Sequence, residues 1–173
     1  MRTIRILVTK KCTRSCAWCC NKDWNLDELP KLDYRKLSEF DEIILTGGEP
    51  LLYFTQLVEI IPLIKRFSKG KPIYIYTAYT HDVETIIDIL KIADGITYTL
   101  HGKEDVFIYR KLTAGIEKEK LYAKSLRLNV FEGINGIEVP EFWKVKDNIK
   151  WLKDCPLPKN ETFVRLNNLL EYN

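Results

Sequence analysis

Three cysteines near the amino terminus, Cys12, Cys16 and Cys19, constrain this chain more than any other feature of its sequence. They lie in the stretch CTRSCAWC, which directly follows a short apolar run at residues 4–8. Thiolates are soft ligands, and soft ligands select iron–sulfur clusters, zinc or copper(I). A cluster that accepts four ligands but finds three thiolates keeps one iron open, and an open position separates reactive metal sites from closed structural ones.

A closed zinc site and a disulfide framework both fit these cysteines less well. The fourth ligand of a zinc site would come from one of four residues: Cys20, Cys155, His81 or His101. None of them belongs to a second pair with metal-ligand spacing. The cysteine count is odd, at 5, and Arg2 and Arg5 interrupt any apolar secretory segment. We therefore predict a reducing, cytoplasmic setting in which Cys155 is an isolated thiol, whereas Cys20 could be either a thiol of that kind or a ligand.

A second motif follows an expected buried strand at residues 42–45. It reads Thr46-Gly47-Gly48-Glu49-Pro50. Glycines permit a close approach of the backbone to a ligand, and a glutamate offers an acceptor to an amino group. Alone, such a stretch would be an ordinary strand-ending turn. Here both motifs follow a predicted strand, so we expect them at the same end of the fold.

Together the two motifs resemble those of the radical S-adenosylmethionine (SAM) superfamily. CTRSCAWC is similar to that family's cluster loop, with an aromatic residue, Trp18, before the last cysteine. Gly47, Gly48 and Glu49 resemble its Gly-Gly-Glu segment, which holds the amino group of SAM. The resemblance implies a 4Fe–4S cluster on the three cysteines and its reductive cleavage of SAM to a 5′-deoxyadenosyl radical, which abstracts hydrogen from a substrate. It also implies a reductant such as flavodoxin or ferredoxin.

The resemblance extends to further cofactor-binding positions. Arg127 looks like the strand-five arginine that can pair with the SAM carboxylate. Thr77 lies where relatives carry a strand-three motif near the ribose, and His101 follows strand four, where relatives present a polar contact. Trp18 is expected either to cover one side of the cluster or to pack in the core.

Size and composition predict one domain over residues 1–173. The chain is 46% hydrophobic and 29% charged, with a formal net charge of +3. No run of about 18 apolar residues indicates a membrane span, and nothing indicates a nucleic-acid partner. Strands are expected at 3–8, 42–45, 73–76, 95–100, 126–131 and 162–166, and helices at 17–21, 54–67, 82–92, 106–118 and 141–153. Repeated strand–helix units predict an α/β fold, and the resemblance specifies an open (β/α)6 partial barrel of mainly parallel strands.

Polar residues alternate with apolar ones in the later strands. The alternation sets Arg127 and Asn129 on one face of the fifth strand and Thr97 and Thr99 on one face of the fourth. Because the apolar faces must meet the helices, these polar side chains should point into the lumen. A polar lumen suits a charged, hydroxylated ligand, and we include Thr99 and Asn129 among the cofactor-binding residues.

The substrate is less constrained than the chemistry. Six strand–helix units use nearly all of the chain, so no segment is expected to cover the lumen, yet a radical needs protection from water. A protein substrate could complete the site, which favours an activase of a glycyl-radical enzyme, similar to the anaerobic ribonucleotide reductase activases. The alternatives are a small-molecule enzyme of the 7-carboxy-7-deazaguanine-synthase type and a non-catalytic iron–sulfur module.

Overall fold

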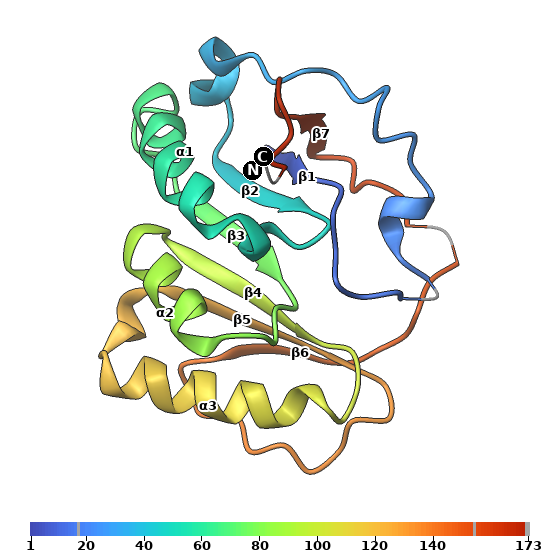
Figure 1. The fold of residues 1–173 in the computed structure, drawn as a ribbon, viewed down its shortest axis with the longest axis vertical. Coiled ribbons are helices and arrows are strands. Elements are labelled where there is room, and N and C mark those ends of the chain that lie inside the picture. The colour runs from blue at the N-terminus through green and yellow to red at the C-terminus, as the bar shows by residue number, and fades with distance from the viewer. Residues whose placement is uncertain (17, 154, 172–173) are drawn as a thin grey trace.

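A curved sheet of seven parallel strands forms the centre of the protein (Figure 1). The structure is a computed structural model that describes residues 1–16, 18–153 and 155–171. The order of strands in the sheet is β6-β5-β4-β3-β2-β1-β7, and the sheet does not close. The strands are β1 (Thr3–Thr9), β2 (Glu42–Gly47), β3 (Ile73–Thr77), β4 (Gly95–Leu100), β5 (Ser125–Phe131), β6 (Lys144–Ile149) and β7 (Glu161–Arg165).

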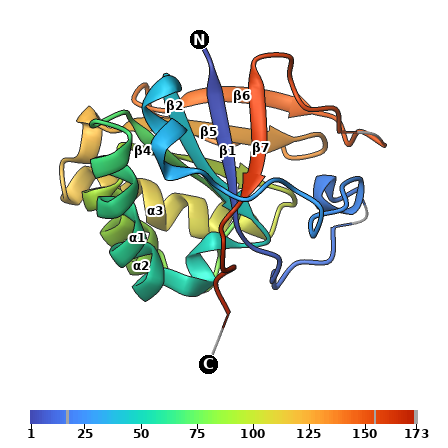
Figure 2. The same ribbon diagram turned by 90° about the horizontal axis from the view of Figure 1, so that it is seen from above.

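The three α-helices of the described residues cover one face of this sheet (Figure 2). The α-helices are α1 (Phe54–Phe67), α2 (Val83–Ile92) and α3 (Asp105–Lys118), and the short 3-10 helices are η1 (Cys20–Lys22), η2 (Tyr34–Glu39), η3 (Pro50–Tyr53) and η4 (Leu121–Ala123). None of the helices in the described part of the chain has the length and apolar character that a bilayer crossing requires. The other face of the sheet is therefore left to loops and to the candidate site.

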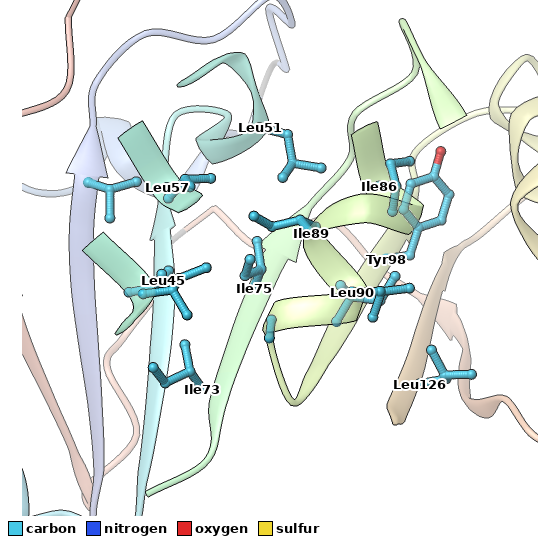
Figure 3. Close-up of a cluster of buried hydrophobic side chains, with 14 of the residues drawn as sticks. Leu45, Leu51, Leu57, Ile73, Ile75, Ile86, Ile89, Leu90, Tyr98 and Leu126 are labelled. Carbon is cyan, nitrogen blue, oxygen red and sulfur yellow. The ribbon is translucent and has the colours of Figure 1, made fainter. Parts of the chain in front are cut away.

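The hydrophobic core lies between the sheet and the helices (Figure 3). Alternate residues of β3, Ile73 and Ile75, are fully buried on the helix side, where Leu57 of α1 and Leu90 of α2 also lie. Side chains of this size each contribute about 1.5–3 kcal/mol when fully buried. The two periodicities, alternate residues in strands and every third or fourth residue in helices, thus make one continuous apolar layer.

The expected strand and helix positions largely agree with the structure. All six expected strands are present, and α1 has the predicted bounds. The helix α2 begins after Asp82, whose carboxylate accepts hydrogen bonds from the backbone N–H groups of Glu84 and Thr85 and caps the helix. The short helix expected at 17–21 begins at a residue outside the described ones, and the described part contains η1 instead.

The helix predicted at 141–153 is wrong, because the structure has the strand β6 there. The apolar spacing fits a helix, but β6 satisfies the backbone groups along the open edge of β5. Trp143, directly before the strand, is only 4% exposed. Its indole Nε1–H donates to Thr113 Oγ1 of α3, so this contact fixes the chain at the start of the strand. Tertiary pairing therefore overrides the local pattern.

The connection from β6 to β7 crosses the sheet face that carries no helix. These two strands follow each other in the chain but lie at opposite edges of the sheet, so residues 150–160 must span its width (Figure 1). We call the described residues 150–153 and 155–160 the strap. Trp151 stacks on His101, with ring centroids 5.1 Å apart, and lies 4.1 Å from the ring of Phe131. The expectation that nothing remains to cover the lumen is thus wrong.

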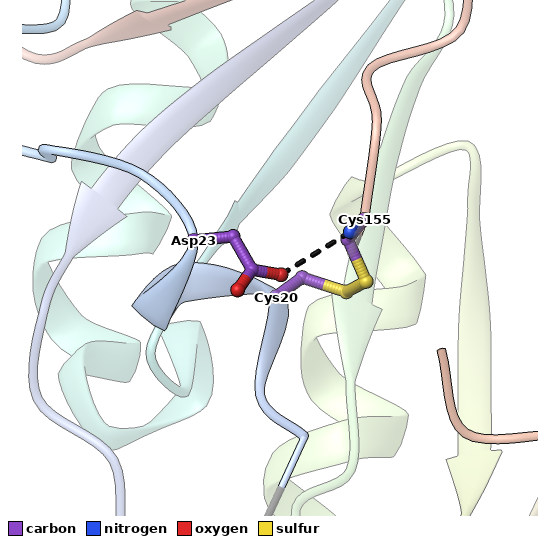
Figure 4. The surroundings of a disulfide bond; sticks show 3 residues. All are labelled: Cys20, Asp23 and Cys155. Carbon is purple, nitrogen blue, oxygen red and sulfur yellow. Dashed lines mark hydrogen bonds between the residues drawn. A yellow bond between two sulfur atoms is a disulfide. The ribbon is translucent and has the colours of Figure 1, made fainter. Parts of the chain in front are cut away.

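A disulfide fastens the strap a second time. It joins Cys155 to Cys20 in η1, and the Cys155 N–H donates to Asp23 Oδ2 at 3.2 Å (Figure 4). The prediction that Cys155 is an isolated thiol is therefore wrong, and Cys20 is paired rather than free. Sequence spacing gave no sign of this bond, because 135 residues separate the two cysteines.

Breaking this bond should loosen the strap and lower stability. A cross-link over so long a loop restricts the unfolded chain, so Cys155→Ser should cost about 2–4 kcal/mol in the free energy of unfolding under oxidising conditions. Urea unfolding with and without a dithiol reductant measures this, and reduction should bring the wild type to the level of the variant. Alkylation and mass spectrometry provide the check: the oxidised chain should expose three thiols, and five labelled thiols would contradict the bond.

Candidate functional site

The two motifs meet where β1 and β2 end. The N–H of Gly48 donates to the Thr9 carbonyl, and the N–H of Glu49 donates to the Lys11 carbonyl, both at 2.7 Å. Lys11 directly precedes Cys12, so these bonds place the Gly-Gly-Glu segment beside the start of the cysteine loop. We call this pairing of Thr9–Lys11 with Gly48–Glu49 the loop junction.

The two glycines are required by the loop junction itself. A Cβ atom at Gly48 would lie 1.9 Å from the Lys11 carbonyl oxygen, and one at Gly47 would lie 2.3 Å from that of Thr9. Gly47 also has φ of +141°, a conformation that side chains disfavour. The sequence predicted a close approach to a ligand; the structure shows a close approach of two loops of the chain. The Gly47 carbonyl additionally accepts a hydrogen bond from Asn21 Nδ2 at 2.6 Å.

The Glu49 carboxylate is 3% exposed and ties the junction to the end of β3. Oε1 accepts from the Thr77 hydroxyl at 2.7 Å and from the Leu51 N–H at 3.1 Å, and Oε2 accepts from the Ala78 N–H at 2.9 Å. Burial raises the pKa of Glu49, and these donors oppose the rise. The predicted residues Glu49 and Thr77 are thus brought together, with the carboxylate bound to protein donors.

The three cysteines have free thiols and differ in exposure. Cys12 is exposed, whereas Cys16 and Cys19 are half-buried. Burial raises the pKa of both Cys12 and Cys16, and the nearby Cys19 adds to each rise because like charges repel. Within residues 1–16, 18–153 and 155–171, no group of three or more His, Cys, Asp or Glu side chains is placed so that it could hold a metal ion. To bind one metal ion or cluster together, the three thiols would therefore have to lie closer to one another.

Arg14, between the first two cysteines, anchors their loop. Its Nε donates to the Ala78 carbonyl at 2.9 Å, and its guanidinium donates to both carboxylate oxygens of Asp105 at 2.5 and 3.2 Å. Asp105 begins α3, is 1% exposed, and also accepts from the N–H groups of His101 and Gly102. Sequence reasoning missed this pair. The available signal was an arginine inside a cysteine loop, which has no partner nearby in the sequence.

The remaining predicted residues divide into two groups. Thr99 and Asn129 are paired in register on β4 and β5, in agreement with the alternation along β5. Arg127 lies elsewhere: its guanidinium is 3.7 Å from Glu42 and 4.6 Å from the ring centre of Tyr74. Glu42 begins β2 and precedes Gly48 of the loop junction by six residues, about 20 Å along the chain at about 3.3 Å per residue. The structure does not bring Arg127 to the two motifs.

The exposure of Trp18 and a ring contact of His101 bear on what was expected of these two residues. Trp18 is 48% exposed, so it does not pack in the core. His101 lies under Trp151 of the strap, and its Nδ1 is buried with no hydrogen-bond partner in the described residues. Burial lowers the pKa of His101 to about 4.

A cavity of about 500 Å³ lies between the sheet and the strap. The sheet contributes residues from several strands, the cysteine loop contributes Cys19, and the strap covers them. The lining residues are Arg5, Cys19, Cys20, Asn21, Trp24, Thr46, Gly47, Tyr76, Lys146, Leu152, Cys155, Pro156, Leu157, Pro158 and Phe163. Both motifs thus border a half-open cavity of the size that holds small molecules.

Comparison with protein-family models gave no match, and comparison with curated proteins gave no significant match. The chemistry of this site is therefore argued from its residues.

Removing Arg14 should destabilise the cysteine loop. Arg14→Ala leaves the buried Asp105 carboxylate without its cation, which should cost about 3 kcal/mol in the free energy of unfolding. Adding Asp105→Asn should recover part of this loss, because no lone charge then stays buried. Urea unfolding measures both, and Arg35→Ala, which removes an exposed ion pair with Asp33, is the control that should change little. Equal effects of the two arginine variants would contradict the anchoring role.

His101 should make stability depend on pH. Its pKa is lowered mainly by burial and further by Arg14, against the pull of Asp105 and Glu104. An unfolded histidine has a pKa of about 6.5, so between about pH 6.5 and 4 the unfolded chain binds a proton that the folded chain does not. Stability should fall as the pH falls through this window.

The test compares the acid dependence of urea unfolding in His101→Gln, His81→Gln and the wild type. His101→Gln should lose less stability than the wild type between pH 7 and 4.5, since the titrating ring is gone. The exposed His81 is the control, and its variant should retain the wild-type slope. A wild-type slope in His101→Gln would contradict the assignment.

Proposed function

We propose that this chain is a radical SAM enzyme and that its open, parallel sheet is the partial barrel of that superfamily. The loop junction is the observation that carries the proposal. Its two backbone hydrogen bonds join the cysteine loop to the Gly-Gly-Glu segment at one end of the sheet. Neither motif alone is specific, but a closed zinc loop would not need Gly48 and Glu49 beside it.

The donor set fits the proposed cofactor in ligand type, although the three thiols would have to move closer together to share a cluster. Cys12, Cys16 and Cys19 supply three soft thiolates from one loop, and the neighbouring Cys20 is withdrawn into a disulfide. These three residues would hold a 4Fe–4S cluster with one iron left for SAM. When bound, the cluster and SAM would supply the electron transfer and the carbon radical that abstracts hydrogen.

The protein itself positions the cysteine loop and SAM and limits the access of water to them. The loop junction holds the start of the cysteine loop, and Arg14 holds the segment between Cys12 and Cys16. For SAM we propose Gly47, Gly48 and Glu49 together with the polar row Thr77, Thr99, His101 and Asn129, at the carboxyl ends of β2 to β5. The strap limits the access of water to the adjacent cavity.

The strap favours a small-molecule substrate over a protein substrate. The activase hypothesis depended on a lumen that only a partner could cover, and this chain supplies a cover of its own. A partly covered cavity of about 500 Å³ fits the small-molecule alternative. We therefore prefer an enzyme that acts on a free small molecule, served by an external electron donor such as flavodoxin or ferredoxin.

Anaerobic reconstitution with iron and sulfide tests the proposal. The wild type should gain the visible absorbance of a 4Fe–4S cluster and, with dithionite and SAM, should form 5′-deoxyadenosine slowly without substrate. Alanine variants of Cys12, Cys16 and Cys19 should each lose the cluster. In the proposed site each thiolate binds one iron and the fourth iron is left for SAM, so none of the three thiolates can be spared.

The matched control is Cys155→Ser, which removes a cysteine outside the loop and should still assemble the cluster. A brown protein that forms no 5′-deoxyadenosine would instead support the non-catalytic iron–sulfur module. Retention of the cluster in any of the three loop variants would contradict the ligand assignment.

A further inference from the structure

The wall of the cavity carries an excess of positive charge. Among its lining residues there is no aspartate or glutamate in the described part of the chain, whereas Arg5 and Lys146 are both present. Arg5 is neutralised by an ion pair with Glu161 and lies over the ring of Tyr76 at 5.3 Å. The ammonium group of Lys146 has no ion pair or hydrogen bond within residues 1–16, 18–153 and 155–171. Lys146 is exposed on the edge strand β6, so it borders the cavity as a cation without a counter-charge among the described residues.

The apolar part of the wall is built from rigid rings. The rings of Trp24 and Phe163 meet edge to face, with centroids 5.6 Å apart and an interplanar angle of 87°. Tyr76 lies on the sheet, and Pro156 and Pro158 belong to the strap. Aromatic side chains and prolines are rigid and stack well on planar groups. This wall suits a ring better than a flexible chain.

The charged, aromatic wall is separate from the residues proposed for SAM. Of those residues only Gly47 lines the cavity, while Thr77, Thr99, His101 and Asn129 do not. The cavity instead extends toward β7 and η1, where Phe163 and Trp24 lie. It is therefore available to a second molecule beside SAM.

We infer that the cavity binds a small planar molecule with an anionic group, and that Lys146 recognises the anion. The inference rests on the proposed function only in identifying this molecule as the substrate. A carboxylate and a phosphate would both pair with an ammonium group. The ring would lie between Tyr76 and the edge-to-face pair, and the strap would close over it.

Three simple probes test this without iron or SAM, on the full oxidised chain. Benzoate and phenyl phosphate carry a ring and an anion, and benzamide has the same ring without charge. In NMR titrations the Trp24 indole signal should shift with all ring probes. One or both anions should bind at least about fivefold more tightly than benzamide, as expected for a charge-assisted contact. The tighter of the two identifies the anion as carboxylate or phosphate.

Variants on one strand supply the controls. Lys146→Gln should reduce the ratio of the benzamide Kd to the anion Kd to about one, whereas Lys146→Arg should keep the wild-type ratio. Lys144→Gln removes the same charge two residues earlier on β6, outside the cavity lining, and should leave the preference unchanged. Equal binding of benzamide and both anions, or equal losses in Lys144→Gln and Lys146→Gln, would overturn the inference.

This outcome is distinguishable from failure of the proposed function. Anion binding that depends on Lys146, in a protein that never cleaves SAM, would retain the site and reject the radical chemistry. SAM cleavage in a protein whose cavity shows no preference for the anion would support the radical chemistry and reject the anion site.

Discussion

The loop junction is the contact on which the rest of the candidate site depends. Two backbone hydrogen bonds hold Gly48 and Glu49 against the segment that leads into Cys12. They can form only because neither Gly47 nor Gly48 carries a side chain, since a Cβ at either position would overlap a carbonyl oxygen. The junction then fixes Glu49 in place, and its buried carboxylate extends the contact to Thr77 and Ala78. One close approach of backbone thus aligns the ends of β1, β2 and β3.

Strand order decides how the site is covered. Because β6 and β7 are consecutive in the chain but occupy opposite edges of the sheet, their connection has to cross the open face. The strap is a consequence of this topology rather than an added domain. Its stacking on His101 and its disulfide to η1 place it over the cavity, beside the cysteine loop. A short chain can therefore enclose a site without a separate lid.

Local patterns in the sequence predicted the fold's regular elements but not its long-range contacts. The stripe of α1 and the alternation of β5 repeat over many residues, so burial and secondary structure follow from them. The helix expected at 141–153 failed because pairing with β5 outweighs a local pattern. The Arg14–Asp105 pair and the Cys20–Cys155 bond join residues 91 and 135 positions apart, and neither has a local signal. Both motifs were visible in the sequence, whereas the structural reason for Gly47 and Gly48 in the second motif was not.

The disulfide and the proposed chemistry make opposite demands on the surroundings. A reductant strong enough to supply electrons to an iron–sulfur cluster also favours reduction of an accessible disulfide, and Cys20 is exposed. Two electrons and two protons would convert the bond to two thiols and leave Trp151 as an attachment of the strap. The stacking of Trp151 on His101 and Phe131 does not involve the disulfide, so it is a separate attachment of the strap. The strap is thus held at Cys155 by a bond that depends on redox conditions and at Trp151 by packing that does not.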